Sequence, residues 1–252
     1  MRDSSRPVRR VERDPAATVD RKAWWASIPA VAAVLEHGLN VPAGVTFLVG
    51  ENGSGKSTLI EGLAGAYGLN AEGGSRGARH QTRASESPLA GALRVIRGAG
   101  GGGHAYFLRA ETMHGLYTYL EQNPPMRGPN LDAELHQKSH GEGFLDVLGR
   151  KFGGPGFYLM DEPEAPLSFV STLGMLGRLD GLRAEGAQVV VATHSPLLTA
   201  LPGATILELG SHGIRKATWE ELDIVGNWRR FLDSPDTFLR SVLGYPQANS
   251  RD

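Results

Sequence analysis

A glycine-rich loop sets the strongest limit on how this chain folds. Residues 45–49 form a short apolar run rich in β-type side chains, and residues 56–67 carry apolar side chains at helical spacing. Between them the sequence matches the pattern G-x-x-x-x-G-K-S, which lets backbone N–H groups and a helix N-terminus surround a phosphate group. The residues expected to bind phosphate are Gly50, Glu51, Asn52, Gly53, Ser54, Gly55, Lys56, Ser57 and Thr58.

Two side chains of this phosphate-binding loop have separate expected roles. Lys56 is expected to reach the β- and γ-phosphates of a bound nucleotide, and the Ser57 hydroxyl to bind Mg²⁺, a hard cation that keeps several of its waters. The alternative is an ordinary glycine turn, because the chain contains 34 glycines. The complete pattern between a strand and a helix rarely arises by chance, so it predicts a nucleotide site.

Two carboxylates follow a second apolar run, residues 157–160. The carboxyl ends of parallel strands face the ligand in nucleotide-binding sheets. Asp161 is therefore expected to hold Mg²⁺, and Glu162 to orient the water that attacks the γ-phosphate, a reaction that depends mainly on positioning. The alternative is that both are solvated acidic residues at the start of a helix.

A histidine follows a third apolar run, residues 189–192. His194 is expected near the γ-phosphate, where an imidazole can bond both the phosphate and the attacking water. The alternatives are a structural histidine and a hydrolase in which Ser195 is the nucleophile. Adjacent residues of a strand point to opposite faces, which disfavours the second of these.

The order of apolar segments predicts an α/β fold. A helix over 167–183 joins the runs at 157–160 and 189–192, the pattern of parallel strands with a crossover. Residues 93–96 and 105–108 are expected to form an antiparallel pair, followed by helices around 113–120 and 144–152. We expect one ATPase domain over 21–245 with a helical insert over about 110–152, a tail over 246–252, and a flexible arm over 1–20 that contains Arg2, Arg6, Arg9, Arg10 and Arg13.

Composition excludes several classes of protein. The chain of 252 residues has no cysteine, which removes disulfides, thiolate metal sites and thiol nucleophiles. No stretch approaches the roughly 20 apolar residues that span a bilayer, and no cleavable leader is visible, so a cytoplasmic location is expected. A formal net charge of −1 is not that of a polybasic nucleic-acid coat.

Together these motifs resemble the ABC-type ATPase superfamily over roughly residues 24 to 240. Residues 161–168 and 193–196 are similar to the matching motifs of its small, non-transporter predicted ATPases. The resemblance implies an α/β fold with a mostly parallel sheet flanked by helices, an antiparallel β portion and a helical signature insert. The resemblance implies ATP and Mg²⁺ as cofactors. It also implies that a degenerate signature segment contacts the γ-phosphate on an opposite protomer in an ATP-bound homodimer, through Ser139, Gly141 and Glu142.

The sequence departs from the family pattern at two places. The signature Leu-Ser-Gly-Gly-Gln is not intact. For the glutamine-bearing loop, Gln81 stands early in the sequence, whereas Arg109 and Glu111 occupy a more plausible place.

The aromatic residue expected to stack on adenine is Trp24 or Trp25, with packing of both on the core as the alternative. Glu134, His136 and His140 suggest a metal site as a further alternative, because the two histidines are one helical turn apart. The absence of an evident third ligand disfavours it.

Three functions remain in competition. The favoured one is a free-standing ATPase that works through ATP-driven dimerisation. The second is the ATPase subunit of a membrane transporter, and the third is a DNA repair or defence switch, for which the arginine-rich arm is the sole support. An unidentified protein partner fits any of them, and the sequence names no biological process.

Overall fold

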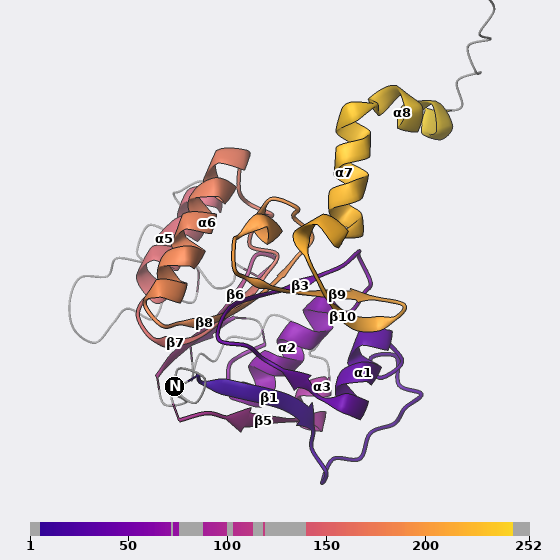
Figure 1. Ribbon diagram of the computed structural model, residues 1–252. Helices are drawn as coiled ribbons and strands as arrows, with labels where there is room; N and C mark the ends of the chain where they lie inside the picture. The colour runs from indigo at the N-terminus through magenta and orange to yellow at the C-terminus, as the bar shows by residue number, and fades with distance from the viewer. Residues whose placement is uncertain are drawn as a thin grey trace, which may run out of the picture.

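The computed structural model describes residues 6–71, 73–75, 88–99, 103–112, 118 and 140–243. It contains a seven-stranded sheet in the order β10-β9-β3-β8-β7-β6-β4 and a three-stranded sheet in the order β2-β1-β5 (Figure 1). The strands are β1 (Val8–Arg13), β2 (Leu39–Asn40), β3 (Gly44–Val49), β4 (Gly74–Ser75), β5 (Leu93–Arg97), β6 (His104–Arg109), β7 (Gly156–Asp161), β8 (Gln188–Thr193), β9 (Thr205–Gly210) and β10 (Gly213–Ala217).

The five central strands of the large sheet run parallel, and β10 and β4 close its edges antiparallel. Their register brings the carboxyl ends together. Val49 on β3 pairs with Thr193 on β8, and Asp161 on β7 pairs with Ala192 on one side and Arg109 on the other. The expected parallel strands and their crossover are therefore confirmed, and the side chains that follow them share one edge of the sheet.

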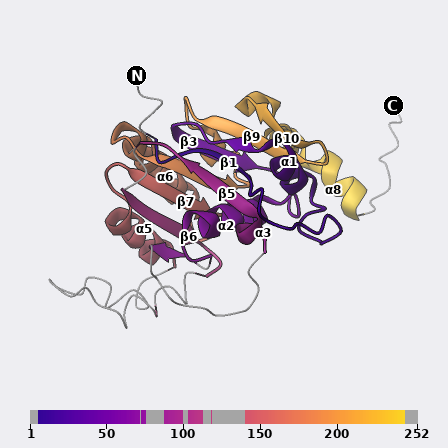
Figure 2. The ribbon, with the colours of Figure 1, turned by 90° about the horizontal axis from the view of Figure 1, so that it is seen from below.

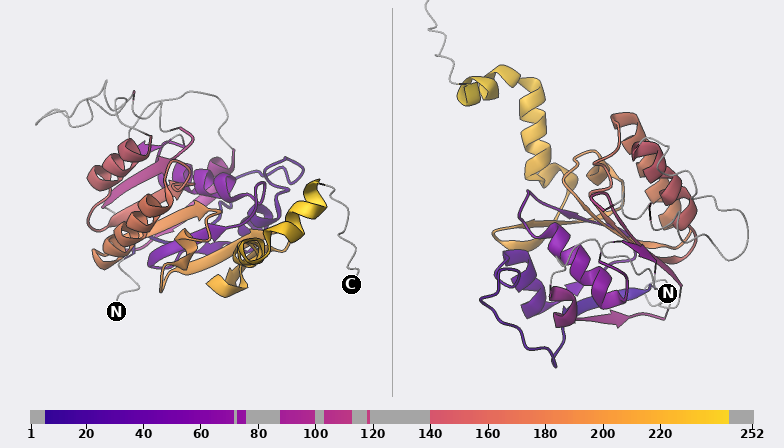
Figure 3. Two further views of the ribbon diagram at one scale, coloured as in Figure 1. Left: turned by 90° about the horizontal axis from the view of Figure 1, so that it is seen from above. Right: turned by 180° about the vertical axis from the view of Figure 1, so that it is seen from behind.

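Helices cover both faces of the large sheet. On one face α5 and α6 pack against Tyr158 and Met160 (Figures 1 and 3). On the other face α2 packs against Phe157 and Leu159, and α1 lies against β9 and β10. Both faces of β7 are apolar because the strand is buried between two layers of helices. The helices are α1 (Pro29–His37), α2 (Lys56–Tyr67), α3 (Leu89–Ala92), α5 (His140–Lys151), α6 (Phe169–Ala184), η2 (Leu198–Ala200), η3 (Trp219–Glu221), α7 (Asp223–Asp233) and α8 (Pro235–Leu243).

The flexible arm expected over residues 1–20 is wrong for the stretch that forms β1. This strand pairs antiparallel with β2 and β5, and Figure 2 shows β1 and β5 side by side. Its register shifts between Val8 and Arg10, so that Val8 and Val11, three residues apart, are both buried. The irregularity breaks the alternation by which a strand is recognised in a sequence.

The antiparallel pair expected from residues 93–96 and 105–108 is also wrong. The first segment is β5, which pairs with β1 in the small sheet, and the second is β6, which lies parallel to β7 in the large sheet. The sequence pattern does not indicate a strand at β1, so it leaves β5 without its true partner. The helix expected over 144–152 is confirmed as α5, whereas the one expected around 113–120 lies outside the described residues apart from position 118.

A buried glutamine ties β1 to the large sheet. The Gln188 side chain on β8 accepts a hydrogen bond from Val8 N at 2.9 Å and donates to Val8 O at 2.8 Å, Val41 O at 3.0 Å and Pro42 O at 2.8 Å. These bonds satisfy backbone groups that water does not reach. Residues near the N-terminus thus belong to the same packed body as the central strands.

We expect Gln188→Met to lower the free energy of unfolding by about 2–4 kcal/mol, because methionine keeps the length of the side chain but leaves buried backbone groups unpaired. The melting temperature should fall by roughly 5–15 °C in thermal unfolding monitored by circular dichroism. Lys22→Met, at an exposed position, is the matched control. A melting temperature for Gln188→Met equal to that of the control would contradict this role.

Two other features complete the architecture. Helices α7 and α8 project from the body and expose Trp228, Leu232, Val242 and Leu243 (Figures 1 and 3). Among the described residues no helix is both long and apolar enough to cross a membrane.

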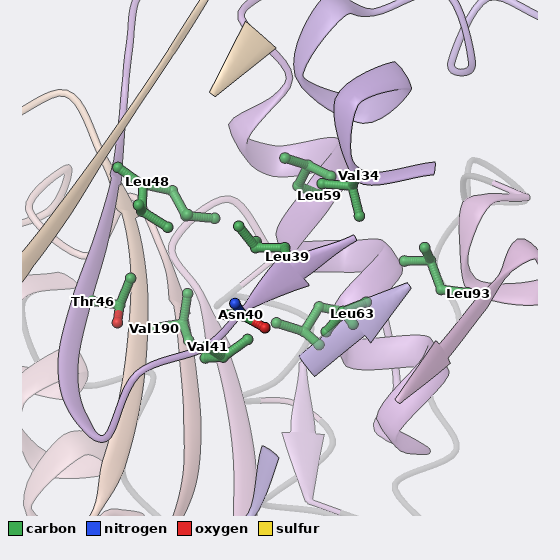
Figure 4. A pocket seen from close by; sticks show the side chains of 12 residues that line it. Val34, Leu39, Asn40, Val41, Thr46, Leu48, Leu59, Leu63, Leu93 and Val190 are labelled. Carbon is green, nitrogen blue, oxygen red and sulfur yellow. The ribbon is translucent and has the colours of Figure 1, made fainter. Parts of the chain in front are cut away.

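Figure 4 shows a small cavity inside the core, lined mostly by apolar side chains. Its volume of about 20 Å³ admits little more than one water molecule.

Candidate functional site

The phosphate-binding loop connects β3 to α2 as expected. Gly53 and Gly55 have φ angles of 83° and 97°, which favour glycine. A Cβ atom on Gly50 would lie 2.5 Å from Leu209 O, so this position also needs glycine. Helix α2 begins with Gly55 as its N-cap and has no side-chain capping bond. The N–H groups of its first turn are therefore available to an anion.

Lys56 points into the hollow of this loop. Its side chain is buried, and Nζ donates hydrogen bonds to Gly50 O at 2.7 Å and Glu51 O at 3.0 Å. Burial lowers the pKa of Lys56 below its usual value, while the nearby carboxylates of Glu162 and Asp161 oppose that change. Within the described part of the chain the hydrogen-bond partners of the ammonium group are these two carbonyl oxygens, so a phosphate that enters the loop offers it stronger acceptors.

Ser57 and Asp161 meet although 104 positions separate them in the chain. Ser57 Oγ donates to Asp161 Oδ1 at 3.2 Å. Burial raises the pKa of Asp161 to about 6, and the guanidinium of Arg109 acts in the opposite direction. A hydroxyl and a carboxylate are oxygen donors of the kind that Mg²⁺ prefers, and two protein ligands suffice when phosphate and water complete the shell. The pair therefore fits the expected metal site.

Glu162 and His194 also come together, at the ends of the neighbouring strands β7 and β8. His194 Nδ1 lies 3.4 Å from Glu162 Oε1, and both side chains are partly exposed. Glu162 has a φ of 47°, a left-handed conformation that costs a non-glycine residue of order 1 kcal/mol. Its N–H donates to Ala192 O at 2.9 Å, which helps to hold this turn. The two expected catalytic side chains thus share one end of the site.

Glu164 is a site residue for which the sequence pattern predicts no role. Its carboxylate, only 10% exposed, accepts hydrogen bonds from Thr193 Oγ1 at 2.5 Å and from the backbone N–H of His194 at 3.1 Å. These bonds join the loop after β7 to the end of β8. A glutamate so close to a strand end is a signal for such a contact, but its partner is visible only in three dimensions.

Arg109, a candidate from the sequence for the position of the glutamine-bearing loop, also lies in the site. It ends β6 beside Asp161 and makes ion pairs with Glu61 at 2.8 Å, Glu111 at 3.1 Å and Asp161 at 3.4 Å. Together with Ser57, Asp161 and Glu162 it lines an open cavity of about 570 Å³. Sequence spacing placed Arg109 and Glu111 near the site, and the structure puts the guanidinium next to the expected metal ligand.

The other expected site residues have mixed outcomes. Gly141 and Glu142 lie in the first turn of α5, which begins at His140. The other residues expected at the signature segment, the glutamine-bearing loop and the metal site lie outside the described residues: Ser139, Gln81, Glu134 and His136.

Of the two tryptophans proposed to stack on adenine, Trp25 is buried in the core and Trp24 is 63% exposed, so only Trp24 is open to a base. Ser195 Oγ accepts from Leu198 N at 3.3 Å as part of a turn, which disfavours its role as a nucleophile.

Comparison with known proteins supports an ATP-binding domain. No family model matches the sequence. The ribose import ATP-binding protein RbsA 2 of Burkholderia pseudomallei strain 1710b and the ribose import ATP-binding protein RbsA of strain K96243 are each 30% identical to it over 192 residues. The aligned region covers 67% of this chain and 37% of each relative. The chain thus spans little more than a third of the length of these curated relatives.

Solved structures with a similar fold are more distant in sequence. One, an inward-facing conformation of a metal-chelate type ABC transporter, has 14% identity and a TM-score of 0.49 over 90% of this chain and 88% of that chain. Another, cbiO1 of Clostridium perfringens from the ABC transporter complex cbiONQ, has 14% identity and a TM-score of 0.46 over 82% and 90%. The phosphate-binding loop, the strand order and the sequence matches together place this chain in the ABC-type P-loop ATPase superfamily.

Proposed function

We propose that this chain binds ATP with Mg²⁺ and hydrolyses it to ADP and phosphate. The observation that carries the proposal is the convergence of Lys56, Ser57, Asp161, Glu162 and His194 on the carboxyl edge of one parallel sheet. Catalysis of phosphoryl transfer depends mainly on positioning the reactants and on stabilising negative charge in the transition state. The charged and polar groups of these side chains can do both.

Each residue has a distinct task in this proposal. The N–H groups of the loop and Lys56 bind the β- and γ-phosphates. Ser57 and Asp161 would hold Mg²⁺, which would supply positive charge to stabilise the phosphates. Glu162 accepts a hydrogen bond from the attacking water and orients it. His194, 3.4 Å from Glu162, donates to the γ-phosphate or the water. Glu164 keeps His194 in place through its backbone N–H and through Thr193.

We further propose that a second copy of the chain completes the site. The amides at the start of α5, near Gly141, would reach the γ-phosphate bound to the partner, together with Ser139 and Glu142. Exposed apolar side chains support a protein contact close to the site, because Phe169 and Val170 are 69% and 75% exposed just after the loop that carries Glu162. The ATPase would act in the cytoplasm, which suits the absence of cysteine.

A second candidate function is the ATP-binding subunit of a membrane importer. The names of the two curated relatives favour it, since both are ribose import ATP-binding proteins. The site chemistry would be the same, and the difference would lie in a membrane partner. ATP-dependent self-association of the isolated chain favours the free-standing enzyme, and a chain that stays monomeric with bound ATP favours the subunit.

Phosphate release from Mg-ATP by the purified wild-type chain tests the hydrolysis itself. We expect turnover that saturates with ATP and stops when EDTA removes the metal, because Asp161 and Ser57 then no longer connect the phosphates to the protein. Release of phosphate at the same rate in EDTA would contradict the metal role. Binding of ATP without any release, alone or with a second copy, would contradict the hydrolytic one.

A further inference from the structure

Arg109 is the one guanidinium on the cavity that contains Ser57 and Asp161, as far as the described lining residues show. Its side chain is 16% exposed and lies between carboxylates, with Nη2 at 2.8 Å from Glu61 and Nε at 3.4 Å from Asp161. Nε is buried, and its contact with Asp161 is an ion pair that lacks hydrogen-bond geometry, as far as the described residues show. The guanidinium thus keeps donor capacity that its ion pairs do not use.

The charges around this cavity explain why Arg109 lies where it does. Asp161 and Glu61 are nearly buried carboxylates, and Lys56 is occupied by carbonyl oxygens of the phosphate-binding loop. Among the described residues, Arg109 is therefore the cation that forms an ion pair with Asp161 before any ligand binds. Buried carboxylates need such a counter-charge, since desolvation without one is costly.

Binding of a magnesium–triphosphate would change this balance. With a divalent cation bound, Asp161 would no longer need the counter-charge of Arg109, and the guanidinium would be repelled from its place. The terminal phosphate arrives with the metal and carries the negative charge that relieves the repulsion. The planar fork of an arginine matches phosphate oxygens, and the cavity leaves the group open to them.

We propose that Arg109 binds the terminal phosphate of the nucleotide, and that the ion pairs with Asp161 and Glu61 hold it ready for this task. This inference rests on the proposed function. Since ADP lacks the terminal phosphate, Arg109 makes the site distinguish a triphosphate from a diphosphate. Its carboxylate partners provide the alternative position to which it returns once that phosphate has left.

The test compares two nucleotides under two metal conditions. Affinities for the non-hydrolysable β,γ-imido analogue of ATP and for ADP are measured by calorimetry, with Mg²⁺ and with EDTA, for wild type, Arg109→Gln and Arg109→Lys. We expect Arg109→Gln to weaken binding of the triphosphate by about tenfold and of ADP by less than about twofold. The loss should persist in EDTA, because the contact to phosphate does not need the metal.

Controls separate this contact from other effects. Arg94→Gln removes an exposed arginine that pairs with Glu12 on the small sheet, and it should change neither affinity. Arg109→Lys keeps the positive charge beside Glu61 and Asp161, so it remains informative if Arg109→Gln unfolds. It should retain part of the preference for the triphosphate.

Two results would overturn the inference. Equal losses for the triphosphate and ADP would mean that Arg109 does not contact the terminal phosphate. A loss seen only with Mg²⁺ would mean that it acts solely by placing Asp161. In both cases the wild-type chain still binds ATP, whereas a wild-type chain that binds neither nucleotide would instead overturn the proposed function.

Discussion

Lys56→Ala should abolish measurable ATP binding, with an affinity at least about a hundredfold below that of the wild type, equivalent to about 3 kcal/mol. The change removes the buried ammonium whose Nζ lies 2.7 Å from Gly50 O and 3.0 Å from Glu51 O. A phosphate in the loop would then lose its closest positive charge while its own desolvation remains. Truncation of one partner of a buried charged pair typically costs this much.

Calorimetric titration with Mg-ATP measures the effect, and Lys22→Ala provides an exposed lysine as the matched control. Thermal unfolding of the variant shows whether the loop still folds without its internal hydrogen bonds. A folded Lys56→Ala protein that binds ATP within about threefold of the wild type would mean that the nucleotide does not occupy this loop. The proposed function would then lose its foundation.

The residues of the site that could be predicted from sequence are those fixed by a contiguous pattern or by the end of a strand. The phosphate-binding loop is local, since its conformation depends on its glycines and on the helix that follows. Ser57 and Asp161 are distant in sequence, but the rule that parallel strands present their carboxyl ends at one edge brings them together. The same rule brings His194 to Glu162.

The features that could not be predicted are contacts between residues that are far apart in the sequence, which no local sequence pattern indicates. Gln188 belongs to a continuous apolar strand, and its four hydrogen bonds go to backbone groups more than 140 positions away. Arg109 ends an ordinary strand, and only the pairing of β6 with β7 sets it beside Asp161. In β1 the arginines and the shifted register interrupt the alternation of apolar and polar residues. The sequence therefore looks like a charged flexible arm, although it forms a strand.

Glu162→Gln should retain ATP binding within about threefold and reduce turnover by about a hundredfold or more, because the amide keeps the size of the side chain but no longer accepts a hydrogen bond from water as a charged oxygen does. The lifetime of bound ATP then increases. If a second copy completes the site, the ATP-bound protein should accumulate as a dimer. Light scattering on a sizing column, with and without Mg-ATP, measures this change.

Three outcomes separate the parts of the proposal. Hydrolysis at the wild-type rate would mean that Glu162 does not position the water, and Glu220→Gln, at an exposed position, is the control for the same chemical change. A shift from one chain to two with ATP would support a trans role for the segment around Gly141 at the start of α5. A single chain with ATP bound would direct the search to a different partner, because the apolar side chains of Phe169 and Val170 beside the site would still lack a cover.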